Sequence, residues 1–381
     1  APLLVGIGFA PVRAVVLALL GHAAGVSFGA VGTPVLTQAE ITGLDGREIA
    51  AATALLHALV GSILLLTLVR LAGDEPLCRR DFVWSGGAAL CFFVPSVLLA
   101  AFAGPELPTL GGALIGSLVF ATLLWRRQPR PATEIASADD PRIAAGLRPT
   151  RGVGDRRLLA DLAPYAIILV LVLATRLLPE VRAALTGPAL DWTLFDTYRG
   201  RFEPLFHPGS LLFVGLLASA VLTGRGAHLL PSLAAALRRL GPVALALLAM
   251  LALSRVMVHS GMIAELASAA ARAGAVWPLL APAVGVLGTF VTGSATASNI
   301  LFSEFQLGTA TALGLSPIAM LAAQSFGAAI GNIVAPHNII AGAATVGLKN
   351  REGEVLAKTL MPCALMVIAG GALLLALVAI S

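Results

Sequence analysis

Two polar, glycine-rich stretches interrupt an otherwise apolar region of this 381-residue chain. Residues 292–299 carry hydroxyl and amide side chains together with a glycine: Gly293, Ser294, Thr296, Ser298 and Asn299. Residues 324–338 contain two more amides and a histidine: Asn332, His337 and Asn338. Where such a stretch breaks a helix, exposed backbone N–H groups and the positive end of the helix dipole attract an anion. Both stretches are therefore candidate binding sites for a small carboxylate.

The same residue types also permit close helix packing, since small side chains let two backbones approach in a membrane. Within an apolar span, however, a helix break leaves backbone groups without water, and it is tolerated only beside protein or a water-filled cavity. Paired breaks near the middle of a bilayer are typical of secondary transporters. We therefore interpret the two stretches as a transporter binding site, with close helix packing as the alternative interpretation.

Titratable side chains could move a proton with such a substrate. Histidine changes protonation state near neutral pH, which makes His337 and His22 candidates, with capping or interfacial roles as the alternative. Glu40 and Glu304 could also carry a proton, because burial disfavours a charged carboxylate. Arg255 lies within an apolar run and could bind a carboxylate through two hydrogen bonds, or it could pair with Glu304 or Glu40.

The composition defines the elements that position these residues. The chain is 58% hydrophobic and only 12% charged, about half the charged share of a soluble domain. We therefore expect an all-α polytopic membrane protein. The net charge of +5 comes from arginines in short segments between apolar runs, so we expect a lipid bilayer as the surrounding partner and no nucleic acid. The cysteines have no metal-ligand spacing, and HExxH and GxSxG motifs are absent, so we expect neither a metal site, a cofactor nor an enzyme.

The order of apolar runs predicts three parts. Residues 1–125 form a first membrane part, residues 126–157 an arginine-rich cytoplasmic linker, and residues 158–381 a second membrane part. Within the second part we expect a surface helix over residues 229–240, followed by a separate span over residues 243–259.

The first part contains an interruption that parallels the one near the end of the chain. Residues 27–32 are similar to residues 325–331, and residues 43–48 are similar to residues 347–352. Paired interruptions in two halves are typical of transporters with inverted repeats, re-entrant hairpins and broken helices. On this basis Gly32 and Thr33 join the predicted substrate site.

These motifs resemble the L-lactate permease family over nearly the whole chain. Residues 293–302 with Gln306 are similar to the family's second hairpin motif, and residues 331–338, 344–348 and 351–353 to its next segment. Residues 28–34, 42–45 and 104–108 are similar to first-half motifs, and residues 260–262 also fit. The family's first hairpin, a Glu-Gly-Ala-Ala-Gly-Phe-Gly-Ala-Pro type motif, is absent except for a tail at Ala1-Pro2. We therefore expect residues upstream of Ala1, and half of the site to lie outside this chain.

The resemblance implies a bacterial inner-membrane symporter that carries L-lactate, and glycolate, together with protons. A sodium-coupled carboxylate carrier of the same superfamily is one alternative, in which Ser298, Asn299 and backbone carbonyls would bind the ion. A channel or a membrane scaffold without transport is another. The sequence leaves open whether the carrier is a homodimer.

Overall fold

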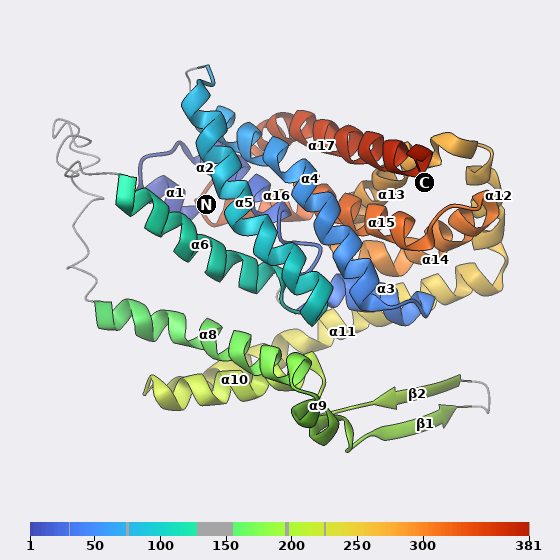
Figure 1. Cartoon of the computed structure of the whole chain (residues 1–381), viewed down its shortest axis with the longest axis horizontal. Helices are drawn as coiled ribbons and strands as arrows, with labels where there is room; N and C mark the ends of the chain where they lie inside the picture. Colours follow the sequence, from blue (N-terminus) through green and yellow to red (C-terminus); the bar gives the residue numbers. More distant parts are fainter. Residues whose placement is uncertain (30, 74–75, 128–154, 195–197, 225, 381) are drawn as a thin grey trace. The chain divides into compact units, whose positions relative to one another are not determined.

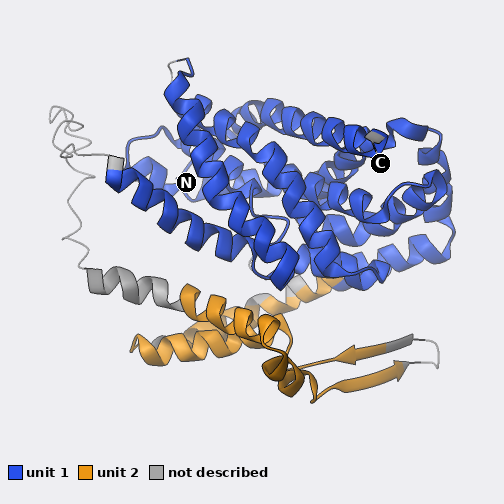
Figure 2. Ribbon diagram, viewed as in Figure 1, with its two compact units in different colours: residues 1–149, 248–381 blue, residues 150–247 orange. Residues whose placement is uncertain are grey.

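The computed structural model describes residues 1–29, 31–73, 76–127, 155–194, 198–224 and 226–380. They form two compact units (Figure 2): unit 1 comprises residues 1–149 and 248–381, and unit 2 comprises residues 150–247. Most of the predicted linker, residues 128–154, lies outside the described residues. The division into residues 1–125, 126–157 and 158–381 stays a prediction.

Unit 1 is helical throughout its described residues (Figure 1). Its first half contains α1 (Pro2–Gly6), α2 (Pro11–Ala23), α3 (Thr33–Thr42), α4 (Gly46–Ala72), α5 (Arg79–Ala103) and α6 (Pro108–Arg127). Its second half contains α12 (Met262–Ala271), η3 (Gly274–Val276), α13 (Trp277–Thr292), α14 (Ala295–Leu313), α15 (Pro317–Gly331), α16 (Pro336–Ala344) and α17 (Glu352–Ile380).

Six helical segments among the described residues are long and apolar enough to cross a membrane. The longest include Gly46–Ala72 and Glu352–Ala379, and 27 helical residues span about 40 Å, more than the hydrocarbon thickness. The bent pair Ala244–His259 and Met262–Ala271, which meets at 72°, could supply a seventh span. The prediction of an all-α polytopic membrane protein is confirmed.

The centre of unit 1 is α15, which packs against α4, α13, α14 and α17 (Figure 1). Every residue from Met320 to Gly331 is buried, so this helix has no lipid-facing or polar face. Close contact with α13 depends on glycine: a Cβ on Gly327 would overlap the backbone of Pro282, and one on Gly285 would meet the backbone of Gln324. Small residues thus bring the two backbones together, as is usual between helices in lipid.

Two segments of unit 1 share one order of elements. In the first, α2 ends at Ala23, a turn follows, and α3 and α4 come next. In the second, α15 ends at Gly331, a turn follows, and α16 and α17 come next. The short helix ends at a left-handed glycine in both, Gly43 with φ 70° and Gly347 with φ 67°. We name the described residues of the first turn, 24–29 and 31–32, the first break, and the turn at residues 332–335 the second break. An inverted relation between the halves remains a prediction.

One predicted boundary is wrong. The surface helix over residues 229–240 and the span over residues 243–259 are a single helix, α11 (Leu229–His259), which begins in unit 2 and ends in unit 1. The pair Gly241-Pro242 suggested a boundary, yet the helix continues through it. Apolar spans tolerate proline where neighbouring groups satisfy the freed backbone carbonyl.

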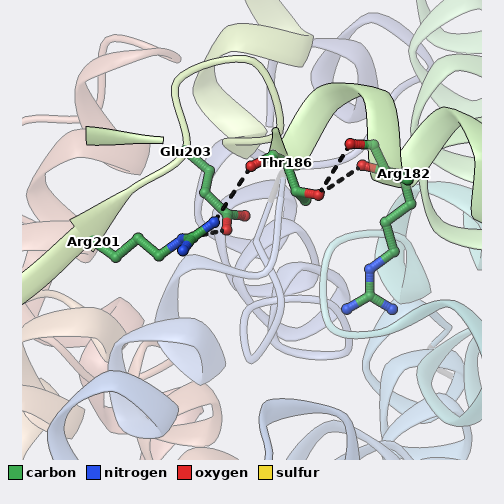
Figure 3. A network of polar contacts seen from close by, with 5 residues as sticks. Arg182, Thr186, Arg201 and Glu203 are labelled. Atoms are coloured by element: carbon green, nitrogen blue, oxygen red, sulfur yellow. Dashed lines mark hydrogen bonds and ion pairs between the residues drawn. The ribbon is translucent and has the colours of Figure 1, made fainter. Parts of the chain in front are cut away.

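Unit 2 contains α8 (Asp155–Leu177), α9 (Pro179–Thr186), α10 (Pro208–Leu222) and η2 (Gly226–His228). It also contains an antiparallel hairpin of β1 (Leu190–Leu194) and β2 (Tyr198–Phe202), which the sequence analysis did not predict. One hydrogen bond joins the hairpin to α9 (Figure 3), since Arg201 Nη2 donates to the Thr186 carbonyl at 3.5 Å. Arg201 Nε donates to Glu203 Oε1, just after β2, at 3.0 Å.

Candidate functional site

The first predicted interruption is a tight turn between α13 and α14. Gly293 ends α13 with φ 72°, and Ser294 caps α14 by accepting a hydrogen bond from the Ala297 N–H at 3.3 Å. Thr292 Oγ1 closes the turn by donating to the Gly288 carbonyl at 2.8 Å. The break is thus confined to Gly293 and Ser294, and Thr296, Ser298 and Asn299 already belong to α14.

The second predicted interruption is also shorter than residues 324–338. Helix α15 continues to Gly331, and Asn332 follows it and donates from Nδ2 to the Ala328 carbonyl at 3.0 Å. Asn338 Nδ2 in turn donates to Asn332 Oδ1 at 2.7 Å. These two amides therefore satisfy one another and the end of α15, which is a capping role.

The hairpin turn and the second break meet in space. A Cβ built on Gly293 would lie 3.0 Å from the Cβ of His337, the second residue of α16. Because α14 begins at Ala295 and α16 at Pro336, the N-termini of two helices are neighbours. Both present the positive end of a helix dipole, and an anion is favoured there.

Asn299 ties three segments together in the interior of unit 1. Its Nδ2 donates to the Pro34 carbonyl of α3 at 3.1 Å and to Ser325 Oγ of α15 at 2.9 Å. Ser325 Oγ donates to Gln38 Oε1 at 2.6 Å, and Gln38 Nε2 donates to the Leu321 carbonyl at 3.1 Å. All of these polar side chains are fully buried.

The orientation of the Asn299 amide follows from its neighbours. A backbone carbonyl only accepts hydrogen bonds, so the NH₂ group and not the oxygen must face Pro34. Asn299 Oδ1 then points elsewhere, and it is buried with no donor from the described residues. A buried acceptor without a donor is uncommon and costs roughly 1–3 kcal/mol. A bound molecule that donates a hydrogen bond would remove that cost.

A second branch of buried polar groups lies between α13, α14 and α15. Gln324 Nε2 donates to Ser298 Oγ at 3.1 Å, and Ser298 Oγ donates to the Gly285 carbonyl at 2.9 Å. Gln306 Nε2 donates to Gln324 Oε1 at 3.3 Å, and its own Oε1 accepts from Trp277 Nε1 at 3.2 Å. Ser298 is therefore fully engaged with protein groups.

The first break lies between α4 and the turn that joins α5 to α6. Gly32, with φ 75°, precedes α3, and a Cβ there would lie 2.5 Å from the Pro105 carbonyl. Ser27 Oγ lies 2.7 Å from His57 Nε2 and donates to the Ser325 carbonyl at 3.0 Å. The first break therefore reaches the central helix α15, which also leads into the second break.

The other predicted residues differ in their surroundings. Arg255 forms an ion pair with Glu304, with Nη2 and Oε1 2.7 Å apart and 17% of the Glu304 side chain exposed. Glu40, Thr33, His22 and His337 are exposed, and Thr296 is half-buried. The structure thus brings together Gly293, Ser294 and His337 at one point and Asn299 with the α3 segment at another. It does not bring Arg255, Glu304 or Glu40 to either.

A cavity of about 570 Å³ opens beside the first break, bounded by α2, α4, α5 and α6. Its lining is mostly apolar, with His22, Thr109 and Ser117 as its polar members. Thr109 Oγ1 is occupied by donating to the Gly25 carbonyl at 2.8 Å. Such a lining offers little to a carboxylate.

Five buried polar residues near the breaks were not nominated from the sequence. They are Ser27, Gln38, His57, Glu106 and Ser325. A signal existed for each: a polar side chain inside or next to an apolar run is costly and is by default a functional hypothesis.

Comparison with known proteins places the whole chain in one family. The model of the family described as L-lactate permease matches residues 1–200 and 197–381. The L-lactate permease of Salmonella typhimurium is 27% identical over 379 residues, which cover 93% of this chain and 69% of the relative. The glycolate permease GlcA of Escherichia coli K12 is 27% identical over 397 residues, which cover 94% of this chain and 70% of the relative. No solved structure gives a match. Because the family match extends over residues 1–381, the chain belongs to the L-lactate permease family.

Proposed function

We propose that this protein is a secondary transporter that imports L-lactate, and also glycolate, by proton symport across the inner membrane of a bacterial cell. The relatives support the substrate class, since they include permeases named for L-lactate and for glycolate. Both compounds are small 2-hydroxy monocarboxylates. The helical membrane fold supports a carrier embedded in a bilayer.

We base the proposal on one observation: the N-termini of α14 and α16 are neighbours at Gly293 and His337. A carboxylate entering the membrane must replace its hydration shell with fixed donors, and two helix N-termini provide N–H groups and positive dipole ends. Ser294 adds a hydroxyl group at the N-cap of α14, and Thr296 adds one in its first turn. Each neutral hydrogen bond contributes about 1 kcal/mol, so several hold the substrate without trapping it.

Asn299, which lies at a different point from the two helix N-termini, is a separate candidate for contact with the 2-hydroxyl of the substrate. Its Oδ1 accepts from no described residue, and the hydroxyl of lactate or glycolate is a donor of suitable size. In this scheme Gly32, Thr33 and Asn338 shape the two breaks, and Asn332 and Ser298 hold the helices in place.

The test is uptake of radiolabelled L-lactate into liposomes containing the purified protein, with an imposed pH gradient and no sodium. Saturable accumulation that glycolate inhibits and that collapses with a protonophore is expected. Accumulation that needs sodium at fixed pH would favour the sodium-coupled alternative. Flux that never saturates, or no flux at all, would favour the channel or the scaffold.

A further inference from the structure

His57 is the one histidine among the described residues that is buried within the polar network. It lies on α4, is 2% exposed, and its Nε2 is 2.7 Å from Ser27 Oγ in the first break. Its ring centroid is 4.9 Å from that of Phe326 on α15, with the two planes at 57°. The imidazole therefore touches both the first break and the central helix.

The hydrogen bonds of Ser27 define which ring nitrogen carries a proton. A serine hydroxyl has one hydrogen, and Ser27 directs it to the Ser325 carbonyl at 3.0 Å, which can only accept. Ser27 Oγ must then accept from His57, so Nε2 is the protonated nitrogen. A further proton can add only to the lone pair of Nδ1, and it leaves from the same atom.

The position of His57 connects this proton to the substrate site. Ser27 Oγ bonds to the carbonyl of Ser325, and the hydroxyl of Ser325 bonds to Asn299 and Gln38. A change of charge at His57 therefore reaches Asn299 through two residues. A positive imidazole would also offset the charge of a carboxylate within the membrane, where an uncompensated charge is costly. The nearby Phe326 ring can stabilise that positive charge.

The other candidates are placed less suitably for a proton that crosses the membrane with the substrate. His22 lines the cavity beside the first break, His337 and Glu40 are exposed, and Glu304 is already paired with Arg255. Within the described part of the chain, the His57 imidazole contacts Ser27 and Phe326 and takes part in none of the ion pairs.

Five helices of the described chain pack against α4, and their titratable and charged groups are at positions other than Ser27 and Phe326, the two residues that His57 contacts. Helix α15 has none. The others are Arg13 and His22 on α2, Glu40 on α3, Arg79, Arg80, Asp81 and Cys91 on α5, and Glu352, Glu354, Lys358 and Cys363 on α17.

We propose that His57 is the carrier of the symported proton, which binds at Nδ1 while Nε2 remains bonded to Ser27. This inference rests on the proposed function, because it assigns a residue to the coupling step of that transport. His57 lies outside the two glycine-rich stretches, and it would supply the proton binding that couples transport to the pH gradient.

Two assays on the full chain in liposomes separate coupling from folding. One measures accumulation of labelled L-lactate driven by a pH gradient, and the other measures exchange of labelled for unlabelled lactate at equal pH. His57→Gln keeps an N–H donor for Ser27 but takes up no proton, so accumulation should fall about tenfold or more while exchange stays within about twofold of the wild type. His259→Gln, an exposed histidine at the end of α11, is the control that should keep both.

Gradient-driven accumulation by His57→Gln at the wild-type level would overturn the inference and leave the proposed function intact. A wild-type protein that exchanges lactate but ignores the pH gradient would instead overturn proton symport itself, and His57 with it. If His57→Gln loses exchange as well, a protein that keeps His57 and His337 and has glutamine at the other four histidine positions decides the matter. Coupling to the pH gradient in that protein supports the inference, and exchange without coupling overturns it.

Discussion

Asn299 and Pro34 are 265 residues apart in sequence and are joined by a 3.1 Å hydrogen bond from the Asn299 side-chain amide to the Pro34 carbonyl. This bond links the second turn of α14 to the first turn of α3, and so connects the hairpin turn to the segment after the first break. A motion that separates α3 from α14 must break this hydrogen bond. A motion that preserves the bond must move the two helices together.

Asn299→Ala should therefore reduce both stability and transport. The change removes the donor to Pro34 and Ser325 and leaves a buried carbonyl with one partner fewer, at a cost of about 1–3 kcal/mol. We expect a lower melting temperature in detergent and at least about a tenfold fall in lactate uptake per protein molecule. Ser303→Ala is the matched control, since Ser303 Oγ only donates to the Asn299 carbonyl within the same helix at 2.6 Å. Equal uptake by the two variants would contradict a substrate role for Asn299.

Gly293→Ala should impair transport more than expected from the backbone strain of alanine at a positive φ. The residue has φ 72°, and a Cβ there would lie 3.0 Å from the Cβ of His337. Gly314→Ala at the end of α14 has nearly the same φ of 66° but no atom within 4 Å of the added Cβ. Both variants carry a strain cost of order 1–2 kcal/mol, and the contact with His337 adds to that cost in Gly293→Ala alone. Lactate uptake should fall only in Gly293→Ala, and an equal loss in both would remove the special role of this turn.

Gly327→Ala tests the contact between α13 and α15. The added methyl group would overlap the Pro282 backbone, and neither backbone can move without displacing the central helix. We expect the variant to be poorly folded, as measured by monodisperse elution in detergent. Gly87→Ala in α5 has open space around the added Cβ and should be neutral or stabilising by roughly 0.5–1 kcal/mol. A well-folded Gly327→Ala protein would contradict this account of the interface.

Composition and motif spacing predicted the membrane fold and the position of the hairpin turn. The turn at Gly293 could be located because a left-handed glycine followed by a capping serine is a local feature. The extent of the second break could not be predicted, because Gly327 and Gly331 allow close contact with α13. Local sequence does not distinguish a glycine that permits helix packing from one that ends a helix.

The polar network was also beyond the reach of local patterns. Ser27, Gln38 and His57 are single polar residues in separate segments, and only the tertiary fold brings them to Ser325 and Asn299. The unpredicted β-hairpin in unit 2 is similar, since its two five-residue strands have a weak pattern and stabilise each other by pairing. The roles assigned to the site residues remain predictions.

Arg255 and Glu304 offer a test that separates a structural ion pair from a substrate contact. Their 2.7 Å contact joins α11 to α14, and Glu304 is the more buried partner. Arg255→Gln leaves a partly buried carboxylate without its cation, so we expect reduced stability and reduced uptake.

The exchange variant Arg255→Glu with Glu304→Arg restores the pair with opposite polarity. Uptake close to the wild-type value in that double variant, measured beside both single variants, is expected if Arg255 acts only through Glu304. If Arg255 instead binds the substrate carboxylate, the double variant will be stable but inactive, because a glutamate at position 255 repels lactate.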